Sequence, residues 1–329
     1  MLAFEDFKGQ SAHIAQLQSD FGAHTFVHAY LLCGPRGTGK KSIARLCAMA
    51  AVCRGEGGKK PCGQCGPCRR ILSDTHPDVH DVLPEKGKQT IGVGVLRDVL
   101  AEVSVKSFEG TIKALIFPEA ERMTPAAQNC LLKTLEEPPQ DTVFFLITEQ
   151  PGSMLATIVS RCRVIRFHPL SQEDCEKRLL AHGLSAMDAK RRARMAEGCV
   201  GKALEIDEER LALMEKVTGD VFSVHRSGDV LTVVNIYKDD KERQKMVMDL
   251  LETAVRDILL AQAGKASLED GGYAREAVNY ARAVPLAGGL ALASSITRAR
   301  MMLGSNVSFA AAFESVLLKI SEEYARWPW

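Results

Sequence analysis

The sequence GPRGTGK at residues 34–40 constrains the fold more than any other segment of the chain. It ends a short apolar run at 29–34 and opens a stretch expected to be helical at 42–53. A glycine-rich loop between a buried strand and a helix lets backbone N–H groups converge on phosphate oxygens, and the helix N-terminus adds positive potential. The pattern therefore predicts a phosphate-binding P-loop with ATP as the candidate ligand. Its candidate nucleotide-binding residues are Gly34, Gly37, Thr38, Gly39, Lys40 and Ser42.

The positions that should bind Mg²⁺ beside such a loop are altered. In nucleotide-hydrolysing P-loop proteins a Ser or Thr after the loop lysine and an Asp at the end of a later apolar strand hold the metal. Here these positions are Lys41 and Pro118, and only the next residue, Glu119, is acidic. Two independent losses around one ion predict a degenerate site that does not hydrolyse ATP. The loop amides and Lys40 remain, so weak ATP binding is left open.

Four of the ten cysteines lie close together, at Cys53, Cys62, Cys65 and Cys68. The spacing C-x8-C-x2-C-x2-C is typical of a closed tetrahedral Zn²⁺ site with four thiolate ligands. A saturated shell leaves no open position, so this zinc is expected to be structural. The alternatives are four unrelated thiols, or a redox-active Cys-x-x-Cys pair that would need only two of them.

Short β-type runs alternate with helical patterns in the first half of the chain. Apolar spacing at 95–103 and 127–135 is helical, and the β-type runs lie at 29–34, 78–83, 113–118, 142–148 and 163–167. Alternating strands and helices predict an α/β fold, a parallel sheet with helices on both faces.

After Pro169 the sequence shows helical patterns without a convincing series of strands. We therefore expect three domains: an α/β P-loop domain at 1–168 with a zinc-binding insertion at 53–68, a small helical domain at 169–207, and a larger helical domain at 208–329. Two apolar stripes in the last domain are expected to be buried core. They consist of Leu251, Val255 and Ile258, and of Phe313, Leu317, Ile320 and Tyr324.

Charge and hydropathy exclude some classes of function. The chain has 42 basic and 41 acidic residues and a net charge of +1, which argues against nucleic-acid binding through bulk charge alone. No apolar run reaches the roughly 18 residues of a membrane span, and the N-terminal MLAFEDFKGQ lacks a signal-peptide layout. We therefore expect a cytoplasmic protein without membrane contact. In that reducing compartment its cysteines are not expected to form disulfides.

Several segments together resemble the AAA+ clamp-loader subunits of bacterial DNA polymerase III. They are HAYLL at 28–32 leading into the loop, the four-cysteine insertion followed by HPD at 76–78, NCLLKTLEEPP at 129–139, and SRC at 160–162. The resemblance covers about residues 3–205 and, more loosely, 306–320. Within this family Lys41 and Pro118 favour the non-hydrolysing delta-prime type. Gly201, which stands where motor subunits carry a nucleotide-sensing arginine, favours the same type.

The resemblance implies a place for the chain in an assembly. It implies a hetero-pentameric ring with gamma or tau motor subunits and a delta subunit, which loads the sliding clamp onto primed DNA. It also implies that 169–207 is the lid and 208–329 an oligomerisation collar. Arg161, beside Ser160, would serve as a trans arginine finger for a nucleotide held by a neighbouring motor subunit. A purely structural arginine, capping a helix or paired with a carboxylate such as Glu149, is the alternative.

Two other functions remain open at this point. The first is an ATP-hydrolysing gamma or tau motor subunit of the same family. The second is a zinc-module DNA-binding protein with a relic P-loop, which a basic stripe beside the cysteines would favour. The cations there are Lys59, Lys60, Arg69 and Arg70, and without interleaved aromatic residues they are more typical of a solvated surface.

Overall fold

The computed structural model describes residues 3–7, 11–56, 60–103, 107, 112–265, 267–268 and 271–327. The chain divides into two compact units. The first contains Met1–Asp174 and Cys199–Gly201, and the second contains Cys175–Gly198 and Lys202–Trp329. The expected division into three domains stays a prediction. The residues at 175–198, expected in a small separate domain, group here with the C-terminal helices.

A five-stranded parallel sheet forms the centre of the first unit, in the order β2-β3-β4-β1-β5. Each of the five expected strands is present within a residue or two of its expected ends. Every residue of β4 is buried, which explains its unbroken apolar sequence, because a parallel sheet is covered on both faces. The strands are β1 (Ala29–Cys33), β2 (Val79–Asp81), β3 (Lys113–Phe117), β4 (Thr142–Thr148) and β5 (Arg163–Arg166).

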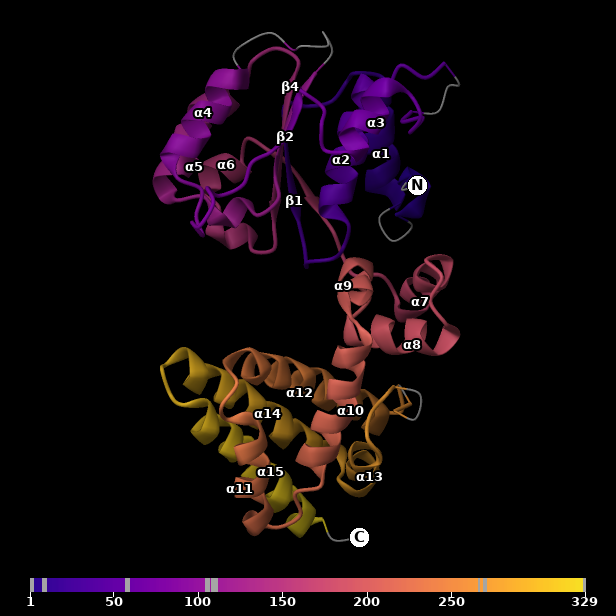
Figure 1. Ribbon diagram of the computed structural model, residues 1–329, viewed down its shortest axis with the longest axis vertical. Coiled ribbons are helices and arrows are strands. Elements are labelled where there is room, and N and C mark those ends of the chain that lie inside the picture. Colours follow the sequence, from indigo (N-terminus) through magenta and orange to yellow (C-terminus); the bar gives the residue numbers. More distant parts are fainter. Residues whose placement is uncertain are drawn as a thin grey trace. The chain divides into compact units, whose positions relative to one another are not determined.

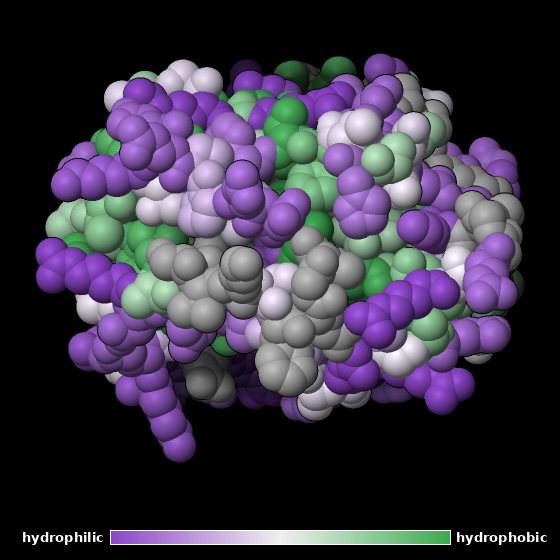
Figure 2. All heavy atoms as spheres, turned by 90° about the horizontal axis from the view of Figure 1, so that it is seen from above, coloured by the Kyte–Doolittle hydropathy of each residue, from purple (hydrophilic) through white to green (hydrophobic). Residues whose placement is uncertain are grey.

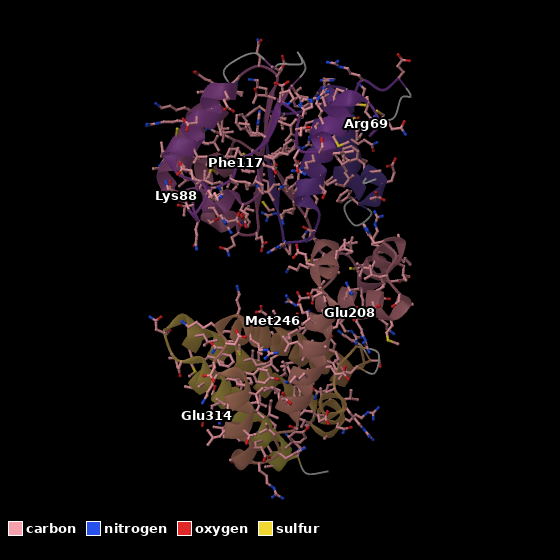
Figure 3. All side chains as sticks on the ribbon, in the orientation of Figure 1. Arg69, Lys88, Phe117, Glu208, Met246 and Glu314 are labelled. Atoms are coloured by element: carbon pink, nitrogen blue, oxygen red, sulfur yellow. The ribbon has the colours of Figure 1, made fainter. Side chains whose placement is uncertain are left out.

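Helices cover the two faces of this sheet (Figure 1). Side chains alternate along β1, so Tyr30 and Leu32 pack with α1, α2 and α3 while Leu31 and Cys33 pack with α4, α5 and α6. Phe117, in the middle of the unit in Figure 3, is fully buried on the second of these faces. The helices are α1 (Ser11–Gly22), α2 (Lys40–Val52), α3 (Gly66–Leu72), α4 (Val93–Val103), α5 (Pro125–Glu136) and α6 (Ala156–Val159), with short 3-10 turns at Phe4–Asp6, Ala120–Arg122 and Pro151–Ser153.

The described part of the chain after residue 169 contains helices and no strand. Both predicted apolar stripes lie in the core of the second unit, which confirms their expected burial. The fold class is therefore the expected one, an α/β P-loop domain of the AAA+ type followed by a helical part. The later helices are α7 (Gln172–Ala181), α8 (Ala186–Met195), α9 (Val200–Glu205), α10 (Glu208–Phe222), α11 (Ser227–Tyr237), α12 (Lys241–Gln262), α13 (Arg275–Ala283), α14 (Leu286–Gly304) and α15 (Phe309–Arg326).

Hydrophilic side chains cover much of the face seen in Figure 2, with smaller hydrophobic areas among them. Folded proteins commonly expose such areas, because apolar atoms contribute roughly half or more of their accessible surface. In the described ranges, none of the helices has both the length and the apolar character that crossing a bilayer requires.

A buried charge joins α8 to α12 within the second unit. The carboxylate of Asp257 accepts a hydrogen bond from the Tyr273 hydroxyl at 2.6 Å, and its Oδ2 lies 3.5 Å from Nε of Arg194. Arg256 completes the cluster, donating to Asp257 Oδ1 at 2.8 Å and to the Arg194 carbonyl at 3.2 Å. Asp257 and Arg194 are both buried. The contacts explain why residues 175–198 belong to the second unit.

Asp257→Ala is expected to destabilise the second unit by about 3–5 kcal/mol, because it leaves the Arg194 guanidinium buried without its counter-charge. Denaturant unfolding measures the change. Asp249→Ala on the same helix is the matched control, since Asp249 pairs with Arg300 at the surface and such pairs contribute about 0–1 kcal/mol. Equal stabilities of the two variants would contradict a supporting role for the buried cluster.

Candidate functional site

The glycine loop connects β1 to α2 at the carboxyl end of the sheet. Gly34 has a φ of +143°, and a Cβ there would lie 2.2 Å from the Phe167 carbonyl oxygen. Its N–H donates to the Thr148 carbonyl at 3.2 Å, which ties the loop to the end of β4. Gly39, with a φ of +87°, is the residue from which α2 begins. The P-loop expected from the sequence therefore has the required strand–loop–helix context, and its glycines are needed for close approach and for left-handed backbone.

Lys40 is buried and folds back onto its own loop. Its ammonium donates to the Gly34 carbonyl at 2.6 Å and to the Pro35 carbonyl at 2.7 Å. Burial lowers the pKa of Lys40, and the carboxylates of Glu149 and Glu121 oppose that effect. The charged side chain that would contact phosphate is thus held by backbone oxygens.

A second contact to the loop comes from residue 201. The N–H of Gly201 donates to the Gly37 carbonyl at 2.8 Å, and a Cβ at position 201 would lie 2.8 Å from the Gly37 Cα. This close approach leaves space for glycine only. An arginine, expected at this position in a motor subunit, does not fit the arrangement. Within the loop, Thr38 donates its hydroxyl to the Pro35 carbonyl at 2.8 Å.

The residues at the two expected metal positions make other contacts. The Lys41 ammonium pairs with Asp81 at the end of β2, at 2.6 Å, so a carboxylate holds it. Pro118 follows β3 directly and has no side-chain oxygen. Glu119 pairs with Arg122, three residues further along the chain, at 3.1 Å. Neither the lysine nor the proline can act as a ligand for Mg²⁺. For Ser42 on α2, the structure shows a half-buried side chain.

The four clustered cysteines come together in space. The sulfur atoms of Cys53, Cys62, Cys65 and Cys68 all lie within 4.8 Å of one another. Backbone N–H groups point at them: Cys62 N donates to Cys53 Sγ at 3.3 Å, and Cys65 N to Cys62 Sγ at 3.3 Å. Donors from Gln64 and Cys65 lower the pKa of the Cys62 thiol to about 6. Four converging sulfurs, two of which accept backbone N–H bonds that favour thiolate, fit a tetrahedral metal ion.

The cysteine cluster is also part of the core of the first unit. Cys53 ends α2, and Cys68 lies on α3 with its sulfur 4.0 Å from the Met49 carbonyl. Arg69 is exposed on the same short helix, as Figure 3 shows. Lys59, one of the four cations considered above, lies outside the described residues.

Arg161 lies just after α6, before β5, where the sequence places it. Its Nη1 donates to the Thr157 carbonyl at 2.9 Å and its Nη2 to Glu136 Oε1 at 2.6 Å. Ser160 donates its hydroxyl to the same Thr157 carbonyl at 3.1 Å. The guanidinium thus both caps a helix and pairs with a carboxylate. The local carboxylate is Glu136, at the end of α5, whereas the example considered for a purely structural arginine was Glu149.

Two site residues were missed by the sequence reasoning. One is Glu136. The other is Gln128 on α5, whose buried amide donates to the Ser153 carbonyl at 3.2 Å and accepts from the Leu155 N–H at 2.8 Å. These bonds hold the segment that leads into α6. A buried amide on the apolar side of a helix was the available signal, because such a group needs partners.

Comparisons with known proteins agree with the motifs. The family model described as "DNA polymerase III, delta subunit" matches residues 9–171. The DNA polymerase III subunit delta' of Bacillus subtilis is 37% identical over 244 residues, which cover 72% of this chain and 73% of that protein. The tau subunit of the same organism is 36% identical over 170 residues, which cover 52% of this chain and 30% of that subunit.

Several solved structures match most of the chain, and one of them is a relative by name. It is a DNA polymerase III gamma subunit-related protein from Thermotoga maritima, with 17% identity, a TM-score of 0.45, and coverage of 94% of this chain and 99% of that one. The assignment rests on the sequence relatives. With 37% identity over nearly three quarters of the Bacillus protein, the chain belongs to the family of DNA polymerase III delta-prime subunits.

Proposed function

We propose that this chain is a non-hydrolysing subunit of a clamp loader that supplies an arginine finger in trans. It assembles with gamma or tau motor subunits and a delta subunit in a hetero-pentameric ring, through a C-terminal collar at 208–329. In the cytoplasm, the ring places a sliding clamp on primed DNA. The observation that supports this most is a combination: Lys41 and Pro118 occupy both metal positions, while Arg161 keeps an accessible guanidinium.

Loss of the metal ligands bears directly on hydrolysis. Phosphoryl transfer depends on Mg²⁺ to neutralise charge developing on the phosphate oxygens. Lys41 stands in the sequence where the metal-binding hydroxyl would be, and its side chain is an ammonium paired with Asp81 that offers no oxygen to a metal. Lys40, held by the Gly34 and Pro35 carbonyls, would have to exchange these bonds for phosphate. Together these contacts support ATP binding that is weak or absent, with no turnover.

Zinc is the metal that best suits the four cysteines. Four thiolates are a closed structural set for this ion, and no position remains for substrate or water. Zinc would then hold Cys53, at the end of α2, against α3. Since α2 begins at the P-loop, the ion would brace the end of the helix that lies farthest from the loop.

Measured ATP hydrolysis separates the proposed function from the motor-subunit alternative. If the proposed function is correct, purified chain with Mg²⁺ and ATP releases phosphate at the background rate, because both metal ligands are lost. A complex of motor and delta subunits is expected to load clamps on primed DNA only when the chain is added. Magnesium-dependent turnover by the pure chain, abolished in Lys40→Ala, would favour a motor subunit. Equal loading with and without the chain would contradict the proposed function.

The DNA-binding alternative has a separate readout. Arg69 and Arg70 lie beside the cysteine cluster, on a helix of seven residues. If that surface gripped DNA, the isolated chain would bind a duplex with strong salt dependence, since displaced counterions set the slope. The proposed function expects no such binding by the chain alone.

A further inference from the structure

The carboxylate of Glu136 contacts the arginine that the proposed function places at a neighbour's nucleotide. Glu136 Oε1 lies 2.6 Å from Nη2 of Arg161, and Nη1 of the same guanidinium donates to the Thr157 carbonyl. The Arg161 side chain is 34% exposed and that of Glu136 51%. The arginine is therefore held by two acceptors at its end nitrogens while a third of its surface stays open to solvent.

The chain brings these two residues together over 25 positions of sequence. Glu136 is the last residue of α5, and Arg161 follows α6. The bonds from Gln128 to Ser153 and Leu155 fix the start of α6 against α5, so the two helix ends stay in register. The packing of α6 against α5 therefore brings Arg161 to Glu136, and α5 holds the Glu136 carboxylate in place.

We propose that Glu136 is a positioning residue, which orients Arg161 toward the nucleotide of a neighbouring motor subunit. This inference rests on the proposed function. An arginine side chain has many rotamers, and a finger acts only when its planar fork meets the phosphate at the right angle. The Thr157 carbonyl alone fixes one nitrogen. With Glu136 in place a second nitrogen is fixed, and the plane of the guanidinium is set before the neighbour arrives.

The contact with Glu136 still leaves Arg161 able to bind a phosphate group. A guanidinium has five N–H donors, and the two contacts described here take up two of them. A phosphate group carries more charge than one carboxylate and can use the donors that remain. Because Glu136 is exposed and Arg161 is partly so, solvent screens their attraction, and the pair orients Arg161 at little cost to its later exchange of partners.

The variants Glu136→Ala and Glu136→Gln separate orientation from charge. Both remove the negative charge, but glutamine keeps an acceptor oxygen at the same reach. The quantity to follow is the Arg161-dependent ATP turnover, the difference between the assembled complex and the same complex with Arg161→Ala. We expect Glu136→Ala to lower the kcat of the Arg161-dependent ATP turnover by about two- to fivefold, the effect of losing one charged contact at the surface. The KM for ATP should stay unchanged, and Glu136→Gln should retain most of the rate.

Glu137→Ala is the matched control, since Glu137 is the next residue, is exposed, and lies just past the end of α5. It is expected to leave turnover unchanged. In the double variant Glu136→Ala with Arg161→Ala, turnover should equal that of Arg161→Ala alone, because a positioning residue acts only through its arginine. Thermal unfolding of each isolated chain checks that the fold is retained.

Each other outcome has a definite meaning. A higher rate in Glu136→Ala would show that the carboxylate competes with the phosphate, and would overturn the inference. So would an equal loss on the Arg161→Ala background, because Glu136 would then act independently of the arginine. If Arg161→Ala slows turnover but Glu136→Ala does not, the inference fails and the proposed function stands. If Arg161→Ala has no effect, both fail.

Discussion

Arg161→Ala is expected to slow ATP hydrolysis at the one nucleotide that the side chain reaches by about 10³-fold or more, the scale of arginine fingers in the best-studied GTPases. The physical reason is charge. Negative charge develops on the phosphate oxygens during transfer, and a guanidinium in a site from which water is excluded stabilises it. Because other motor subunits keep their own sites, total turnover of the complex falls less, and clamp loading is the more sensitive measurement.

Two further variants make the result specific to this side chain. Arg161→Lys keeps the charge but lacks the planar fork, so it should restore only part of the rate. Arg69→Ala removes an exposed arginine from the same unit and should leave clamp loading unchanged. Ring assembly is expected to survive in all three variants, since the described bonds of Arg161 run to Thr157 and Glu136 of its own chain and the proposed collar at 208–329 holds the ring. Normal loading by an assembled Arg161→Ala complex would show that the chain supplies no finger.

Local patterns were sufficient to predict the first unit. A strand that is buried on both faces needs consecutive apolar residues, as in β4, and such a run is visible in the sequence. The P-loop was equally readable, since its glycines meet requirements of the local backbone. The cysteine spacing also carried over, because a metal cluster within sixteen residues depends on chain geometry over a short distance.

Contacts between distant residues were not predictable in the same way. For a purely structural Arg161, the sequence offered a nearby carboxylate such as Glu149 as a partner, yet Glu136 holds the side chain because α5 and α6 end side by side. The cluster around Asp257 joins residues 63 positions apart, Arg194 and Asp257, and nothing in either local sequence marks them as a pair. Such pairs depend on which helices pack together. The apolar periodicity of a helix predicts that one face is buried, but not which residues lie opposite it.

Removal of zinc is expected to unfold the segment at 53–68 and to loosen α2 and α3. Zinc binding by small four-ligand peptides has an apparent free energy on the order of 10 kcal/mol, far more than the few turns around these cysteines could supply by packing. Cys53 and Cys68 are buried in the same core as α2, so the effect should spread beyond the metal loop. Metal analysis should return one zinc per chain, and a chelator should expose the segment to limited proteolysis.

Cys62→Ser and Cys130→Ser form the matched pair for this test. Cys62 is one of the four converging sulfurs, whereas Cys130 lies on α5 with a similar, half-buried exposure and no part in the cluster. Only the first change removes a ligand, so only Cys62→Ser should lower the zinc content and the unfolding temperature. Protein purified without chelators that contains no zinc, and whose four thiols all react at once with a thiol reagent, would contradict a structural metal. Because α2 runs from the P-loop to Cys53, loss of the ion should also disturb the loop and weaken any residual ATP binding.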